Sequence, residues 1–163
     1  MFTECRDVLR EYLTQSGAAK NIYTSAKTLK ASAESRVFAV LFENEVLTIS
    51  KNKRIYTDIS EKHKRQQKFE RSLTFSVVIG EYTIEKVQEI YNKFLHNIQP
   101  GIYIDGNYVS IEPTAADWMD NEDTIIRAKC AVQITVVCRG GVYKDTDLAK
   151  ADNVALTVNM PPM

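Results

Sequence analysis

The densest group of side chains that could do chemistry lies in the stretch EPTAADWMDNED, from Glu112 to Asp123. This stretch has no basic residue and contains the only tryptophan of the chain, Trp118. Its spacing does not match an EF-hand loop, which needs ligands at alternate positions and a central glycine. A catalytic acid–base pair needs two carboxylates across a cleft, which the sequence leaves open, but a solvated acidic loop is the simpler interpretation. The five carboxylates belong to Glu112, Asp117, Asp120, Glu122 and Asp123.

No other residue pattern indicates catalysis or metal binding. His63 and His96 have no histidine or cysteine at zinc-ligand spacing. Glycine-rich phosphate loops and nucleophile motifs are missing from the sequence. The three cysteines, Cys5, Cys130 and Cys138, are interpreted as small buried apolar residues in a reducing compartment. We therefore expect no catalytic residue, no metal, no cofactor and no enzymatic activity.

A second charged segment, residues 51–71, contains eight basic and three acidic residues, which gives a net charge of +5. We interpret it as a loop or as the extended tip of a long β-hairpin. Tyr56 and Phe69 could stack on bases, and the segment could then bind nucleic acid. The zero formal charge of the chain argues against this, because nucleic-acid-binding modules usually carry a net basic surface. The basic residues expected to make contacts are Lys62, Lys64, Arg65, Lys68 and Arg71.

Hydrophobic periodicity predicts the elements that position these two segments. Two amphipathic helices are expected, one over residues 3–16 with Thr3 as its N-cap, and one over residues 84–98 after Thr83. The connector between residues 18 and 35 has room for a short strand near residues 22–24.

Alternating β-forming residues predict the strands. A first hairpin is expected to turn at Glu43–Asn44, and a second at Asp105–Gly106, which is the signature of a type I′ turn. The run from residue 72 to 80 reads as a half-buried strand with Leu73, Phe75, Val77 and Ile79 on one face. A long strand over residues 126–139 is expected to end at Gly140–Gly141, before a C-terminal tail of residues 144–163.

Together these elements predict one α+β domain over residues 1–163. An antiparallel β-sheet with a long hairpin arm carries two helices packed on one face. The start of the sequence lacks the features of a secretion signal, and no apolar run is long enough for a membrane span.

The two charged segments have opposite charges of equal size. They could meet within one chain or between copies, and a head-to-tail contact between copies closes into a ring where the rotation permits. Trp118 would then act as an aromatic anchor of the interface. The alternative, that Trp118 folds back on its own sheet, remains open.

The order of elements resembles that of tail terminator (tail-completion) proteins of bacteriophages and related contractile particles. The resemblance covers roughly residues 36–143, including LTFSVVIG, the DG hairpin, IEPTAADWMDNEDTI and AKCAVQITVVCRGGVY. It implies a structural protein without catalytic residues that forms a ring, typically a hexamer.

In that family the ring caps the head-proximal end of the tail tube, stops tube polymerisation and joins the neck or head. The implied partners are further copies of the chain, the tail tube protein, and the sheath and neck or head-completion proteins, with DNA only as passing cargo. The implied location is the virion, after assembly in the bacterial cytoplasm. Another neck or connector component is the nearest alternative, and a nucleic-acid-binding module that uses residues 51–71 is a more distant one.

Overall fold

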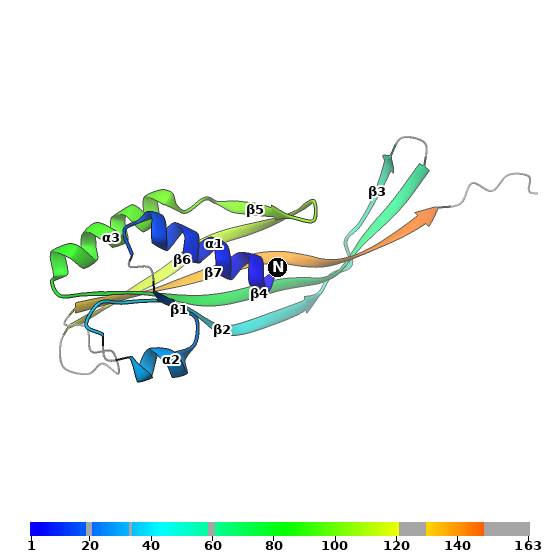
Figure 1. The fold of residues 1–163 in the computed structure, drawn as a ribbon. Helices are drawn as coiled ribbons and strands as arrows, with labels where there is room; N and C mark the ends of the chain where they lie inside the picture. Colours follow the sequence, from blue (N-terminus) through cyan, green and yellow to red (C-terminus); the bar gives the residue numbers. More distant parts are fainter. Residues whose placement is uncertain (19–20, 33, 59–60, 121–129, 149–163) are drawn as a thin grey trace, which may run out of the picture.

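The computed structural model describes residues 1–163 except 19–20, 33, 59–60, 121–129 and 149–163 (Figure 1). It confirms the α+β class. Three helices are present in the described residues: α1 (Phe2–Gln15), α2 (Ala26–Ala31) and α3 (Ile84–Asn97). The seven described strands are β1 (Ile22–Tyr23), β2 (Val37–Ile49), β3 (Lys53–Asp58), β4 (Glu61–Glu81), β5 (Gly101–Ile104), β6 (Asn107–Asp120) and β7 (Cys130–Leu148).

The strands form a single curled sheet with the order β1-β2-β4-β7-β6-β5. All neighbours are antiparallel except β1 and β2, which run parallel, so the sheet is mixed. Where β2 ends, β3 takes its place beside β4, and β7 continues along the other side of β4. These three strands extend away from the body as the arm, which we define as β3, residues 61–69 of β4 and residues 142–148 of β7 (Figure 1).

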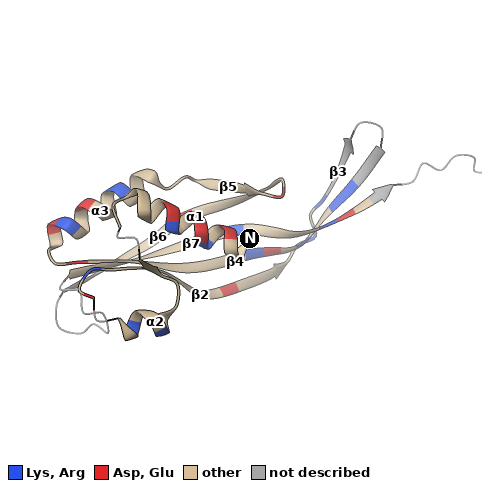
Figure 2. Cartoon of the chain, in the orientation of Figure 1, with Lys and Arg blue, Asp and Glu red and all other residues tan. Residues whose placement is uncertain are grey.

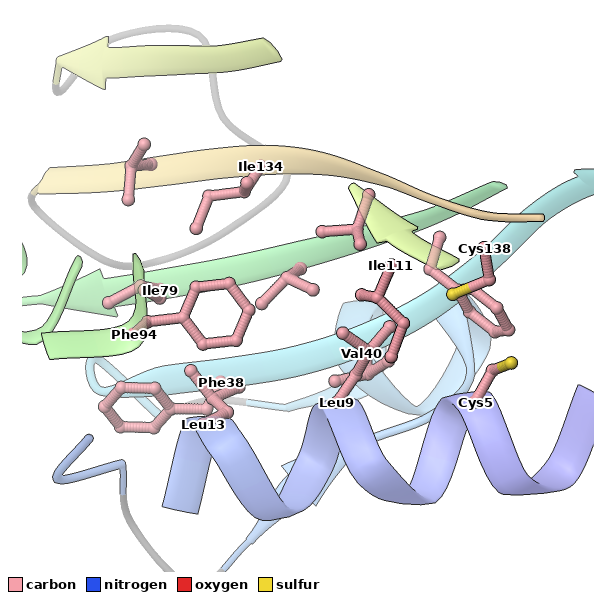
Figure 3. Close-up of a cluster of buried hydrophobic side chains, with 14 of the residues drawn as sticks. Cys5, Leu9, Leu13, Phe38, Val40, Ile79, Phe94, Ile111, Ile134 and Cys138 are labelled. Atoms are coloured by element: carbon pink, nitrogen blue, oxygen red, sulfur yellow. The ribbon is translucent and has the colours of Figure 1, made fainter. Parts of the chain in front are cut away.

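Helices α1 and α3 cover one face of the sheet and enclose the main core (Figures 1 and 3). The four β4 residues predicted to face the core are all fully buried, which confirms the alternation that predicted them. Helix α3 contributes Val87, Ile90 and Phe94, and α1 contributes Cys5, Leu9 and Leu13.

The opposite sheet face is partly covered as well, which the sequence did not predict. Leu29 of α2 packs there against Val37, Ala39 and Val78. Helix α2 was missed because six residues are too few for a clear periodicity, although Ser25 caps it by accepting a hydrogen bond from Lys27 N.

Three predicted strand boundaries were wrong. Glu43 is not in a turn, because β2 runs through it with a β-bulge between Phe42 and Asn44. Gly140 and Gly141 do not end β7, which continues beside β4 to Leu148, so the first five residues of the predicted tail are in a strand. The stretch from Glu112 to Asp120 is not a loop but the second half of β6, paired with β7 along its length. In each case strand pairing overrode a local break signal.

The helix termini agree with the sequence except at the start of α1. Thr83 caps α3, and Gly17, with φ +103°, follows the last turn of α1. Thr3 does not cap α1, because the helix already begins at Phe2 and has Met1 as its N-cap residue.

The predicted type I′ hairpin joins β5 to β6, with Asp105 at φ 48° and Gly106 at φ 74°. A Cβ atom at Gly106 would meet nothing within 4 Å, so a substitution there costs backbone conformational energy alone. We expect Gly106→Ala to lower the free energy of unfolding by about 1 kcal/mol, and Gly106→Asn by less, because asparagine tolerates this conformation. Urea unfolding of the three chains measures the difference, and equal midpoints for Gly106 and Gly106→Ala would contradict it.

Candidate assembly site

The acidic stretch lies along the exposed side of β6. Glu112 and Asp117 are exposed, and Glu112 forms an ion pair with Arg139 of the neighbouring strand β7. Asp120 pairs with Cys130 at the end of β6, but its side chain is not described. Glu122 and Asp123 lie outside the described residues. Of the five carboxylates in the predicted cluster, the structure therefore describes the side chains of Glu112 and Asp117. These two residues lie five positions apart on one strand.

Trp118 folds back on its own sheet, which is one of the two alternatives from the sequence. Its ring packs edge-on against Tyr91 of α3, with 5.2 Å between ring centroids. Its strand partner is the buried Val132, so it lies on the face of the sheet that α3 covers. Nevertheless 45% of Trp118 remains exposed. It is packed on its own body and remains partly exposed.

Two of the five predicted basic residues are paired within the chain. The guanidinium group of Arg65 forms a two-point ion pair with Asp145 of β7 (2.8 and 2.7 Å) and donates a hydrogen bond to Asn107 Oδ1 (3.0 Å). Arg71 forms an ion pair with Glu45 of β2 (2.7 Å). The Arg65 ion pair joins β4 to β7 within the arm, and the Arg71 ion pair joins β4 to β2 in the body. The hydrogen bond from Arg65 to Asn107 connects the arm to β6. Arg65 and Arg71 therefore stabilise the fold of the single chain, and any contact with a partner would be a second role.

Lys64 and Lys68 are the basic residues available for contact. They lie on β4 and are half-buried, and they form no ion pair within the described part of the chain. Figure 2 shows basic positions on β4 within the arm. Lys62 pairs with Leu148 in the strand register, but its side chain is not described.

The outer parts of the two charged segments lie at opposite ends of the sheet. Asp117 pairs with Gln133 of β7, whereas Arg65 pairs with Asp145, twelve residues further along the same strand. At roughly 3.3 Å per residue this is a separation of about 40 Å. Asp117 and Arg65 therefore cannot meet within one chain, whereas Glu112 pairs with Val137 and Arg71 with Gly140, only three positions apart on β7.

A further surface, which the sequence did not reveal, lies at the base of the arm. Ile49, Phe69 and Val142 are direct neighbours across β2, β4 and β7, and Leu47 lies two positions from Ile49 on the same face. We call these four residues the apolar row. Their exposed fractions are 75% for Ile49, 55% for Leu47, 40% for Val142 and 38% for Phe69. None of the four belongs to the main core cluster, although they lie on the face that α1 and α3 cover elsewhere.

The described residues offer little for catalysis. They contain no group of three or more histidine, cysteine or acidic side chains that could hold a metal. No described helix is both long and apolar enough to cross a membrane. Cys5 and Cys138 are buried, and the hydrogen bond between their thiols together with burial raises the pKa of Cys138. A raised pKa keeps this thiol protonated and unreactive.

One buried carboxylate stands out at the end of β4. Glu81 is buried and accepts a 2.7 Å hydrogen bond from Arg36 through Oε1, while its Oε2 has no hydrogen-bond partner among the described residues. Neither Glu112 nor Asp117 lies near it in the register of the sheet, so no pair of carboxylates across a cleft is formed by these groups.

No protein-family model matches the chain, and no curated protein is similar enough in sequence to count as a relative.

Proposed function

We propose that this chain is a structural subunit that assembles head to tail into a closed ring. The observation that carries the proposal is the separation of its complementary surfaces. Asp117 near the end of β6 and Arg65 on the arm lie about 40 Å apart along one sheet. A contact between two different surfaces on successive copies is heterologous, and it closes into a ring if the rotation permits.

The apolar row supports the same proposal. Soluble monomers seldom leave several large apolar side chains exposed side by side on a sheet, and such a surface usually marks a contact with another chain. The row adjoins the basic arm, so one contact would bury apolar area at its centre and place charges at its rim. Charge complementarity would then set the register of the subunits, and apolar burial would supply most of the affinity.

The resemblance to tail terminator proteins implies a ring that caps the head-proximal end of a phage tail tube. The ring would bind the growing end of the tube and block the surface that the next tube subunit needs. It would then offer its free face to the neck, and in a contractile particle also to the sheath. No enzymatic step is part of this role.

The nucleic-acid alternative is weakened by the ion pairs of two of the basic residues. Arg65 is neutralised by Asp145 of β7, and Arg71 by Glu45 of β2. The surface is consequently less basic than the sequence of residues 51–71 suggests.

The molecular mass of the protein in solution tests the ring, with negative-stain imaging as the second measurement. We expect a single closed species, a hexamer if the resemblance holds, with a hollow centre. Addition of the ring to polymerising tail tube protein should shorten the tubes, which distinguishes a terminator from other ring-forming neck proteins. Solitary copies at high concentration would refute the proposal.

A charge-reversal series tests the contact itself. We expect Lys64→Glu with Lys68→Glu to weaken assembly by at least tenfold, because two like charges would then face the acidic strand of the next copy. Lys64 and Lys68 are better probes than Arg65, since they make no ion pair in the described residues and their loss leaves the arm intact. Sedimentation measures assembly, and circular dichroism checks that the monomer stays folded.

The compensating variant is Asp117→Lys. Alone it should weaken assembly, and combined with the two lysine reversals it should restore part of the loss. If all these chains assemble equally, the charges do not contribute to the contact.

A further inference from the structure

A pocket of about 450 Å³ opens where the β5–β6 hairpin meets the base of the arm (Figure 1). The register between β6 and β7 begins at Ser110 and Arg139, so the hairpin leaves the side of β7 at this point. The hydrogen bond from Arg65 to Asn107 connects the arm to the hairpin. The pocket is therefore built into the junction of two elements, and its volume is that of a small-molecule site.

Two glycines allow tyrosine rings to lie close to the backbone in this pocket. A Cβ atom on Gly101 would collide with the ring of Tyr108, which therefore lies across this part of β5. A Cβ atom on Gly141 would lie 2.8 Å from the ring and the hydroxyl group of Tyr143. Both rings are part of the pocket lining, so the two glycines help to shape the site.

Tyr103 supplies an open aromatic surface. Its ring packs edge-on against Tyr108, its partner in the strand register, with 5.4 Å between the ring centroids. Tyr103 is nevertheless 76% exposed and Tyr108 47% exposed. Because the two rings contact each other, no space for a further ring is left between them, and a ligand can stack only on their outer surfaces.

The pocket has little net charge. The guanidinium group of Arg65 lies over the Tyr143 ring, 5.7 Å from its centroid, and its charge is neutralised by the ion pair with Asp145. Lys53 is exposed and adds a single positive charge to the lining. Such a site offers hydrogen bonds and aromatic surface but no strong preference for an anion.

The polar groups of the lining can both donate and accept hydrogen bonds. Asn52 and Gln67 contribute amide side chains, and the three tyrosines contribute hydroxyl groups. These hydroxyl groups form no hydrogen bond within the described part of the chain, so they are available to a ligand. The site therefore suits a ligand that combines a flat apolar face with donors and acceptors around its rim.

We infer that this pocket binds a neutral carbohydrate, with a pyranose ring stacked on Tyr103. A pyranose with equatorial hydroxyl groups presents C–H groups on each face, and the electron-rich face of an aromatic ring attracts them. Its hydroxyl groups both donate and accept hydrogen bonds, as do the amides and the tyrosine hydroxyl groups of the pocket. The inference goes beyond the proposed function, because ring assembly does not require this site.

Two other ligand classes fit the pocket less well. Proline-rich peptides dock in grooves between aromatic side chains, whereas Tyr103 and Tyr108 close the space between them by their own contact. Single-stranded nucleic acid also stacks on tyrosines, but its sites follow a strongly positive groove. Here the guanidinium group of Arg65 is already neutralised within the chain.

Titration calorimetry with chitotetraose and cellotetraose, two neutral β-linked oligosaccharides, tests the inference. We expect the wild type to bind at least one of them with a Kd of about 1 mM or below. Tyr103→Ala should weaken binding about tenfold, and Tyr103→Phe, which keeps the ring, about twofold. The control is Tyr82→Ala, at a tyrosine that is 49% exposed and not part of the pocket, and it should bind like the wild type. Equal weakening by Tyr82→Ala and Tyr103→Ala, or no binding of either oligosaccharide, would overturn the inference.

Gly141→Ala tests the shape of the pocket without removing a side chain from it. The added Cβ atom would displace the ends of Tyr143 and of Gln67, whose Nε2 would lie 2.7 Å from it. Because these ends are flexible, the chain should stay folded, which circular dichroism checks. We expect binding to weaken about tenfold. Unchanged binding would show that the oligosaccharide lies elsewhere and would overturn the inference.

Saturation-transfer NMR gives an independent readout of stacking. Irradiation of the aromatic protons should transfer saturation mainly to the ring C–H protons on one face of the sugar, and equal transfer to both faces would overturn the inference. The molecular mass is measured alongside. Binding by a chain that never assembles would support the inference and refute the proposed function, and a ring that binds neither oligosaccharide would do the reverse. Binding of oligo-dT that depends on Tyr103, without binding of either oligosaccharide, would assign the pocket to nucleic acid instead.

Discussion

Replacement of Leu47 and Ile49 together by threonine is expected to abolish ring formation at micromolar concentration while the chain stays folded. Both side chains are more than half exposed in the single chain, so the monomer loses little when they are changed. Threonine is β-branched and is therefore well tolerated in a strand. If the apolar row is buried between copies, the loss of about 1 kcal/mol at each position weakens every contact roughly 30-fold.

The strand itself supplies the matched control. Val46 is 53% exposed and lies between Glu45 and Leu47, so its side chain points to the opposite face of β2. We expect Val46→Thr to assemble like the wild type. The comparison is made by sedimentation at several concentrations, with urea unfolding of each monomer alongside. Equal loss of assembly in both variants would show that exposure alone, and not this face, governs the contact.

The apolar row could not be predicted from the sequence, because only strand pairing brings its residues together. Ile49, Phe69 and Val142 lie on three strands and are separated by up to 93 positions in the chain, yet pairing brings them into one line. Phe69 was noted in the sequence as a stacking group within a basic run. Its apolar neighbours became visible when β2 and β7 were found on either side of β4.

Local chemistry predicted well those features that depend on a few adjacent residues. The Asp105–Gly106 turn, the Thr83 cap and the alternation of Leu73, Phe75, Val77 and Ile79 were all confirmed. Each is set by backbone conformation or by the period of side chains along a single element. Pairing with distant strands decides where a strand stops, and for that reason Gly140–Gly141 and Glu43 were misread as ends.

For the candidate site, too, the sequence predicted features within single segments but not the contacts between them. The sequence identified two oppositely charged segments but left their meeting place open. The structure places Asp117 far from Arg65, and it pairs Arg65, Arg71 and Glu112 with residues outside the two segments: Asp145, Glu45 and Arg139. Charge counting along the chain therefore overestimated the charge available for contact, because cross-strand neighbours neutralise part of it.

Phe94→Ala is expected to have the largest effect on stability, a loss of about 3–5 kcal/mol in the free energy of unfolding. Phe94 is fully buried in the main core, on the inner side of α3 where the helix faces the sheet. Truncation to alanine removes the transfer energy of a phenyl ring and leaves a cavity that the curled sheet cannot easily fill. The neighbouring Leu95→Ala, at a residue that is 36% exposed, should cost about 1 kcal/mol or less. Urea unfolding compares the two, and equal losses would contradict this account of the core.

Phe94→Ala also tests whether packing of the core positions Trp118 in the assembly site. Phe94 anchors α3, and α3 carries Tyr91, against which Trp118 packs. A loosened α3 should therefore increase the solvent exposure of Trp118 before the chain unfolds globally. We expect the emission of the Phe94→Ala monomer to shift to longer wavelength in the absence of urea, and that of Leu95→Ala to stay unchanged. A wild-type spectrum in the folded Phe94→Ala monomer would mean that β6 alone positions Trp118, and that the orientation of the indole does not depend on helix packing.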